Sequence, residues 1–155
     1  MQPQMMVHDR YFYDPAAHQY TVDKYLKDLD TRYGGIDAVL ITYLTWGIDA
    51  RNQLDMVKSM PGGYAGVRQM VEDFHRRGVR VLFPMMMWDQ GTRNPSESWP
   101  VALANEMKEI DADGVNGDTQ EGVPLSFVMA LVRVGHPLAF RQEGARQTKA
   151  IAGTY

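Results

Sequence analysis

The segment DADGVNGDTQEGVP, residues 111–124, decides the fold, because strands and helices alternate on both sides of it. Residues 113–117 predict a short buried strand, and residues 125–134 predict a helix. Between them a polar turn begins at Asp118 and Thr119. Ligands of α/β proteins bind where parallel strands end, which makes Asp118 a candidate ligand-facing acid. The alternative is that Asp118 caps the turn, since Asp favours turns and helix N-termini.

Outward from this segment, apolar runs of strand length alternate with amphipathic stretches of helix length. A first helix is expected from Thr21 to the Gly34-Gly35 stop, and a long polar connection is expected over residues 44–60. The inward residues of this first helix are expected to be Val22, Tyr25, Leu26, Leu29 and Tyr33. Further helices are expected after residues 61–63, from Ser98 and over residues 125–134. The remaining strands are expected within residues 1–7, 36–43, 79–88 and 136–143.

This alternation favours a partial TIM-barrel-like parallel (β/α) repeat of about five strands and four helices, within the α/β class. A complete (β/α)8 barrel needs about 250 residues, so 155 residues form either a small open α/β sheet or the front part of a barrel. Loops after strands are long and polar, and turns after helices are short, which favours the truncated barrel. We expect one domain over residues 1–144 and a tail over residues 145–155, where no closing pattern is present.

The amino-acid composition argues against several classes of function. The net charge is −3 and basic residues are scattered, which argues against a nucleic-acid surface. There are no cysteines, hence neither a disulfide framework nor a thiolate metal site. No segment has the length of a membrane span or the pattern of a signal peptide, so a soluble protein is expected, cytoplasmic by default.

Polar side chains follow every expected strand, and their convergence predicts a ligand site at one edge of the sheet. Any one of them can equally be an ordinary loop residue or a packed aromatic. The candidate substrate-binding residues are His8, Asp9, Tyr43, Asp49, Trp88, Asp89, Arg93 and Arg141. Asn116 is unusual inside a buried strand, and it can point into the site instead.

The sequence lacks the motifs of several classes of enzyme and binding site. Pro61-Gly62-Gly63 is neither a Walker sequence nor a dinucleotide fingerprint, and Ser126 lacks nucleophile-elbow glycines. The four histidines do not show metal-ligand spacing, and His75 reads as a cation at a helix end. We therefore expect no cofactor and no metal. A metal held by His8, Asp118 and Glu143 is the less favoured alternative.

Two segments resemble the barrels of retaining α-glycosidases, the α-galactosidase-like and α-glucosidase-like glycoside hydrolases. PGGYAGVRQMVEDFHRRGVRVLFP, residues 61–84, is similar to their Pro-Gly turn, helix ending in His-x-x-Gly, and following strand. ADGVNGDTQ, residues 112–120, is similar to their fourth strand, which ends in the nucleophile. The matches occur in the family's order and cover about residues 36–118, the N-terminal part of such a barrel.

The resemblance implies glycoside hydrolysis with retention, in which one carboxylate attacks the anomeric carbon and a carboxyl about 5–5.5 Å away protonates the leaving oxygen. Asp118 matches the nucleophile, and Arg93 or Arg141 would lower its pKa. Relatives carry the acid/base on a sixth strand, beyond the five expected here. Glu143, after the fifth strand, is our candidate acid/base from its position in this chain.

In this interpretation Trp88 and Tyr43 offer ring faces to a sugar, and Asp49 and Asp89 bind hydroxyls. The alternative function is a non-catalytic truncated α/β domain that binds a ligand or self-associates through open sheet edges. A third alternative is lyase or isomerase chemistry on a sugar with the same acids.

Overall fold

The protein is described by a computed structural model at residues 1–7, 9–42, 54–86, 96–117 and 122–142. Its main sheet contains β1 (Gln4–Met6), β4 (Ala38–Thr42), β5 (Arg80–Met85), β6 (Gly114–Gly117) and β7 (Ala139–Gln142). The helices are α1 (Val22–Tyr33), α2 (Leu54–Ser59), α3 (Gly63–His75), α4 (Trp99–Glu109) and α5 (Leu125–Val134). The predicted alternation of strands and helices is confirmed. None of the described helices is long and apolar enough to cross a lipid bilayer.

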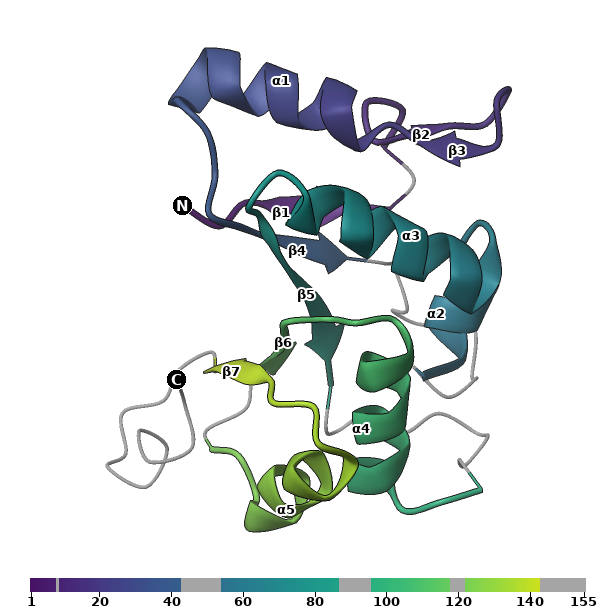
Figure 1. Ribbon diagram of the computed structural model, residues 1–155, viewed down its shortest axis with the longest axis vertical. Coiled ribbons are helices and arrows are strands. Elements are labelled where there is room, and N and C mark those ends of the chain that lie inside the picture. The colour runs from purple at the N-terminus through teal and green to yellow at the C-terminus, as the bar shows by residue number, and fades with distance from the viewer. Residues whose placement is uncertain (8, 43–53, 87–95, 118–121, 143–155) are drawn as a thin grey trace.

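The strand order in the main sheet is β1-β4-β5-β6-β7, and all neighbouring pairs are parallel. Each new strand is therefore added at the same side of the sheet, whereas a doubly wound sheet reverses direction at a switch point. Helices α1, α3, α4 and α5 follow one another around the strands (Figure 1). This singly wound order is that of a (β/α) barrel, and the α/β fold is partial and barrel-like, as predicted.

The register divides the sheet into two faces. Met5, Ile41 and Phe83 belong to a core cluster built with the helices, and we call their side of the sheet the helix face. Side chains alternate along a strand, so the residues between them lie on the opposite face. Leu40 and Leu82 of the opposite face are buried as well, but they are not part of that cluster. The strands are thus covered on both sides.

Helix periodicity predicts most of the core correctly. Val67, Met70, Val71 and Phe74 of α3 are all buried, and α5 begins and ends at the expected residues. The prediction for Tyr33 is wrong, because its side chain is 60% exposed at the end of α1. Sequence spacing places Tyr33 on the inward stripe, but Tyr33 is the last residue of α1, and its side chain is not covered there.

Helix ends follow local chemistry only in part. Gly34 adopts the left-handed conformation (φ 74°) that ends α1, as predicted, and Gly135 does the same for α5 (φ 66°). Thr21 occupies the N-cap position of α1, but its hydroxyl donates to the Tyr11 carbonyl oxygen at 2.9 Å instead of capping the helix.

Two short elements were not predicted. The 44–60 connection contains α2, so the chain has five described helices and not four. Residues after β1 form an antiparallel hairpin of β2 (Tyr13–Asp14) and β3 (Gln19–Tyr20), with Pro15 in its turn. Both elements are too short to show periodicity. They form because α2 buries Leu54 and Val57, and because Phe12 beside the hairpin packs its ring against Tyr20, Tyr25 and Phe74.

Gly114 allows β6 and β7 to approach each other closely. A Cβ at this position would lie 2.5 Å from the Ala139 carbonyl oxygen and 3.2 Å from Leu82 Cγ. Backbone atoms cannot yield as a flexible side chain does, so only glycine fits. The strand that precedes Asp118 is therefore held tightly between β5 and β7.

Candidate functional site

The carboxyl ends of the five parallel strands lie at one edge of the sheet, which we call the carboxyl edge. The described strands end there at Met6, Thr42, Met85, Gly117 and Gln142. Every polar segment singled out by the sequence follows one of these ends. The described strands thus end at one edge of the sheet, where α/β proteins bind ligands, and a site formed there by the segments that follow them stays a prediction.

Most of the candidate side chains lie outside the described residues, and their roles remain predictions. Asp9 and Arg141 are the two that the structure describes. The candidates outside the described residues are His8, Tyr43, Asp49, Trp88, Asp89, Arg93, Asp118 and Glu143.

Asp9 shapes the turn that follows β1. Its Oδ1 accepts the Tyr11 amide at 2.7 Å, and its carbonyl oxygen accepts the amides of Phe12 and Tyr13 at 2.9 and 2.8 Å. This is the loop-capping alternative that the sequence left open for Asp residues. A contact of the exposed Asp9 carboxylate with substrate stays a prediction.

Arg141 lies on β7 in register with Asn116 of β6, on the opposite face of the sheet. Its side chain is exposed, and it forms no hydrogen bond or ion pair with the residues that the structure describes. A cationic side chain thus belongs to the strand beside β6, one register position before β6 ends.

Asn116 and Thr42 are buried polar residues on the same face. Asn116 is 4% exposed and Thr42 is 8% exposed, and neither Asn116 Oδ1 nor Thr42 Oγ1 has a hydrogen-bond partner in the described structure. The sequence marked Asn116 as unusual but did not mark Thr42. A β-branched residue is ordinary in a strand, so the only available signal was a hydroxyl in an otherwise apolar run.

A buried carboxyl lies elsewhere, between α3 and α4. Glu106 is 6% exposed, and its Oε1 accepts the Tyr64 hydroxyl at 3.0 Å. Burial raises the pKa of Glu106 from 4.5 to about 8, although the Tyr64 hydrogen bond and the Lys58 charge oppose this rise. Burial also raises the pKa of the Tyr64 phenol. Sequence reasoning missed Glu106, because an acid within a helix normally faces solvent.

His75 has a partner that the sequence did not predict. It lies in the last turn of α3, at the helix end where the sequence predicted it, and its Nε2 is 2.6 Å from Asp113 Oδ2. The same carboxylate oxygen accepts the Val81 amide at 2.8 Å. Asp113 precedes β6 and Val81 is near the start of β5, so this group joins α3 to the amino ends of two strands. It stabilises the end of the sheet away from the candidate site.

Two surface hollows are also remote from the carboxyl edge. One, of about 320 Å³, lies between the end of α3 and the segment around β3 and the start of α1. The other, of about 450 Å³, is lined by α1 and by residues that precede β4 and β5, including Ile36 and Val79. Asp23 and Arg77 line both hollows and form an ion pair at 2.8 Å. Neither hollow contains a sequence-predicted site residue.

Among the residues that the structure describes, no three His, Asp or Glu side chains are grouped closely enough to hold a metal ion. The alternative metal site of His8, Asp118 and Glu143 lies outside the described residues.

No protein-family model and no curated protein sequence matches this chain. Among solved structures, the chain is similar to a beta-arabinopyranosidase, with 15% identity and a TM-score of 0.47 over 99% of this chain and 24% of the other. It is also similar to a putative chitinase A from Streptomyces coelicolor, with 13% identity and a TM-score of 0.46 over 91% of this chain and 48% of the other.

The chain therefore spans less than half the length of either protein. Both are glycoside hydrolases by name. At these identities and TM-scores the likenesses do not identify an activity for this chain, and they do not single out the α-glycosidase family.

Proposed function

We propose that this chain carries a carbohydrate-active site at its carboxyl edge, with Asp118 as the nucleophile of a retaining glycoside hydrolase and Glu143 as its acid/base. One observation carries the proposal. Gly117 and Gln142 are register partners on adjacent parallel strands, and Asp118 and Glu143 are the residues that follow them in the sequence. Neighbouring strands lie about 4.8 Å apart, close to the carboxyl separation of about 5–5.5 Å that a retaining mechanism uses.

The alternation of side chains supports the same pair. Asn116 and Arg141 share the opposite face, and Asp118 and Glu143 each come two residues later in the sequence. Continuing the alternation would direct both carboxylates to that face. Arg141, which lies there without a described partner, would favour the ionised form of Asp118 that a nucleophile needs.

In the first step, an oxygen of Asp118 would attack the anomeric carbon while Glu143 donates a proton to the leaving glycosidic oxygen. In the second step, Glu143 would take a proton from water, which displaces Asp118 and releases the sugar. His8, Asp9, Tyr43, Asp49, Trp88, Asp89 and Arg93 are proposed to contact the substrate from the loops that follow the strands.

The test is covalent labelling of the whole chain with a panel of sugar epoxides and aziridines, read as the intact mass. We expect a single adduct that is lost in Asp118→Asn and slowed in Glu143→Gln, because the first variant lacks the attacking oxygen and the second lacks the acid. Asp111→Asn is the matched control. Asp111 is an acid at the amino end of β6, and asparagine tolerates its left-handed conformation (φ 59°).

An adduct that persists in Asp118→Asn would reject Asp118 as the nucleophile. A folded chain that reacts with no probe would reject catalysis by this chain, and the non-catalytic alternative would then take precedence.

A specific observation favours self-association as that alternative. Leu125, Met129 and Val132 are 73%, 58% and 70% exposed, and their spacing forms one stripe on α5. The next element, β7, ends the sheet, with no further strand paired to it among the described residues. Contiguous exposed apolar surface marks interaction sites, and an open strand edge invites pairing with another chain. A second copy of the chain is the proposed occupant.

Sedimentation velocity tests this alternative. Met129→Glu is expected to convert a concentration-dependent dimer to a monomer, because a charge at the centre of the stripe would be buried in the interface. Tyr33→Glu, at a 60% exposed apolar position on α1, should leave the dimer intact. A wild-type chain that remains monomeric at every concentration would contradict the alternative.

A further inference from the structure

Five side chains form one row across the opposite face of the sheet, close to the carboxyl edge. The register pairs Met6 with Thr42, Pro84 with Asn116, and Asn116 with Arg141. It also pairs Leu40 with Leu82, and the same register continued by two residues sets Thr42 opposite Pro84. The row therefore runs Met6, Thr42, Pro84, Asn116, Arg141 over the five strands.

Two buried members of the row have polar atoms without partners. Thr42 is 92% buried and Asn116 is 96% buried (exposed fractions 8% and 4%), and Thr42 Oγ1 and Asn116 Oδ1 accept or donate no hydrogen bond within the described structure. A buried polar atom left unpaired is destabilising, so most proteins pair such groups or replace them with apolar ones. Local rules are broken in this way where a function requires it. Two such atoms in one row point to a ligand that supplies their partners.

Pro84 separates the two polar residues. Its side chain is half-buried and offers no hydrogen-bonding group. Thr42 and Asn116 are two strands apart, which corresponds to about 10 Å between their backbones. A ligand of the size of a sugar ring, lying over Pro84, would reach an oxygen on each side. Asn116 Oδ1 accepts hydrogen bonds and Thr42 Oγ1 both donates and accepts, so hydroxyl groups satisfy both.

Arg141 makes the two ends of the row chemically different. It is exposed, it is the register partner of Asn116, and it has no ion-pair partner among the described residues. A guanidinium group binds carboxylate or phosphate through paired hydrogen bonds. One end of the row thus carries neutral hydrogen-bonding groups, and the other carries a cation that has no ion-pair partner within the described part of the chain.

We infer that Thr42, Pro84, Asn116 and Arg141 form a subsite for an anionic monosaccharide. Thr42 and Asn116 bind ring hydroxyls, Pro84 lies beneath the ring, and Arg141 binds a carboxylate or phosphate substituent. The inference rests on the proposed function for the choice of a carbohydrate as ligand. It adds the charge of the sugar and the residues that select it, and it does not depend on turnover.

The test is calorimetric titration of the whole chain with D-glucuronate, D-glucose 6-phosphate and D-glucose. We expect one or both anionic sugars to bind about tenfold more tightly than glucose, the gain expected from a charge-assisted hydrogen bond. The tighter of the two identifies carboxylate or phosphate as the selected group. Arg141→Gln is expected to abolish the preference for the anionic sugar and to retain binding of glucose.

Thr42→Val separates a ligand role from a structural one. Valine has the shape of threonine without the hydroxyl. The variant is therefore expected to keep or raise Tm and to lower the affinity for every sugar about tenfold. Asn116→Leu should behave in the same way. The matched control is Thr31→Val, which removes a hydroxyl that donates to the Lys27 carbonyl oxygen in α1 and should leave the affinity unchanged.

Equal affinity for anionic and neutral sugars would overturn the inference, and so would a folded chain that binds none of them. A fall in Tm without a change of affinity in Thr42→Val would show a structural role and overturn it as well. The experiments distinguish failure of the proposed catalytic function from failure of the subsite. An anionic sugar that binds, together with the absence of any covalent adduct, would reject catalysis and support the subsite.

Discussion

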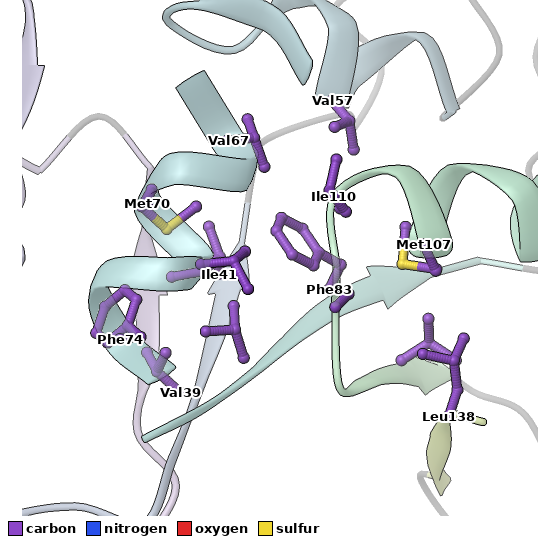
Figure 2. Close-up of a cluster of buried hydrophobic side chains, with 14 of the residues drawn as sticks. Val39, Ile41, Val57, Val67, Met70, Phe74, Phe83, Met107, Ile110 and Leu138 are labelled. Atoms are coloured by element: carbon purple, nitrogen blue, oxygen red, sulfur yellow. The ribbon is translucent and has the colours of Figure 1, made fainter. Parts of the chain in front are cut away.

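Replacing Phe83 by alanine is expected to lower the free energy of unfolding by about 3–5 kcal/mol, a large share of the stability of a domain of this size. Phe83 is fully buried at the centre of β5. Figure 2 shows its ring among Ile41, Val67 and Ile110, which come from β4, from α3 and from the end of α4. Removal of the ring would leave a cavity where the sheet and two helices meet, and this cavity cannot collapse without moving them.

Urea unfolding followed by circular dichroism and by fluorescence measures this effect. Tyr33→Ala is the control, because Tyr33 is also a large aromatic residue but is 60% exposed, and its loss should change stability by less than about 0.5 kcal/mol. Similar losses in both variants would show that the core is not centred on Phe83.

Replacing Glu106 by glutamine is expected to raise the free energy of unfolding more at pH 8 than at pH 5. The difference between the two effects is expected to be on the order of 3 kcal/mol. Burial raises the pKa of Glu106 from 4.5 to about 8 in the folded chain. Between these values the folded state retains a proton that the unfolded state has released. The wild-type protein therefore loses stability as the pH rises from about 4.5 to 8.

Glutamine is neutral at every pH and retains an oxygen that accepts the Tyr64 hydroxyl, so it removes the titration and keeps the hydrogen bond. The measurement is the unfolding free energy of both proteins from pH 5 to pH 8. Glu109→Gln, an exposed acid on the same helix, is the matched control and should follow the wild-type curve. If Glu106→Gln follows that curve too, Glu106 is ionised in the folded state.

The carboxyl edge shows how far sequence reasoning reaches for a candidate site. Strand ends could be predicted from apolar runs and turn residues, so the position of Asp118 directly after β6 followed from the sequence. The pairing of Gly117 with Gln142 could not, because register between strands 25 residues apart depends on how α5 packs. That pairing makes Asp118 and Glu143 a candidate catalytic pair.

By itself the sequence determined the α/β alternation, the limits of α5 and the buried face of α3, because periodicity, Gly34 and Gly135 act within a few residues. Only the tertiary structure decided that α2 forms, that Tyr33 stays exposed and that Glu106 is buried. It also decided that Thr42, Asn116 and Arg141 share one row. These features depend on contacts between distant segments, whose burial and register are set by packing and not by local propensity.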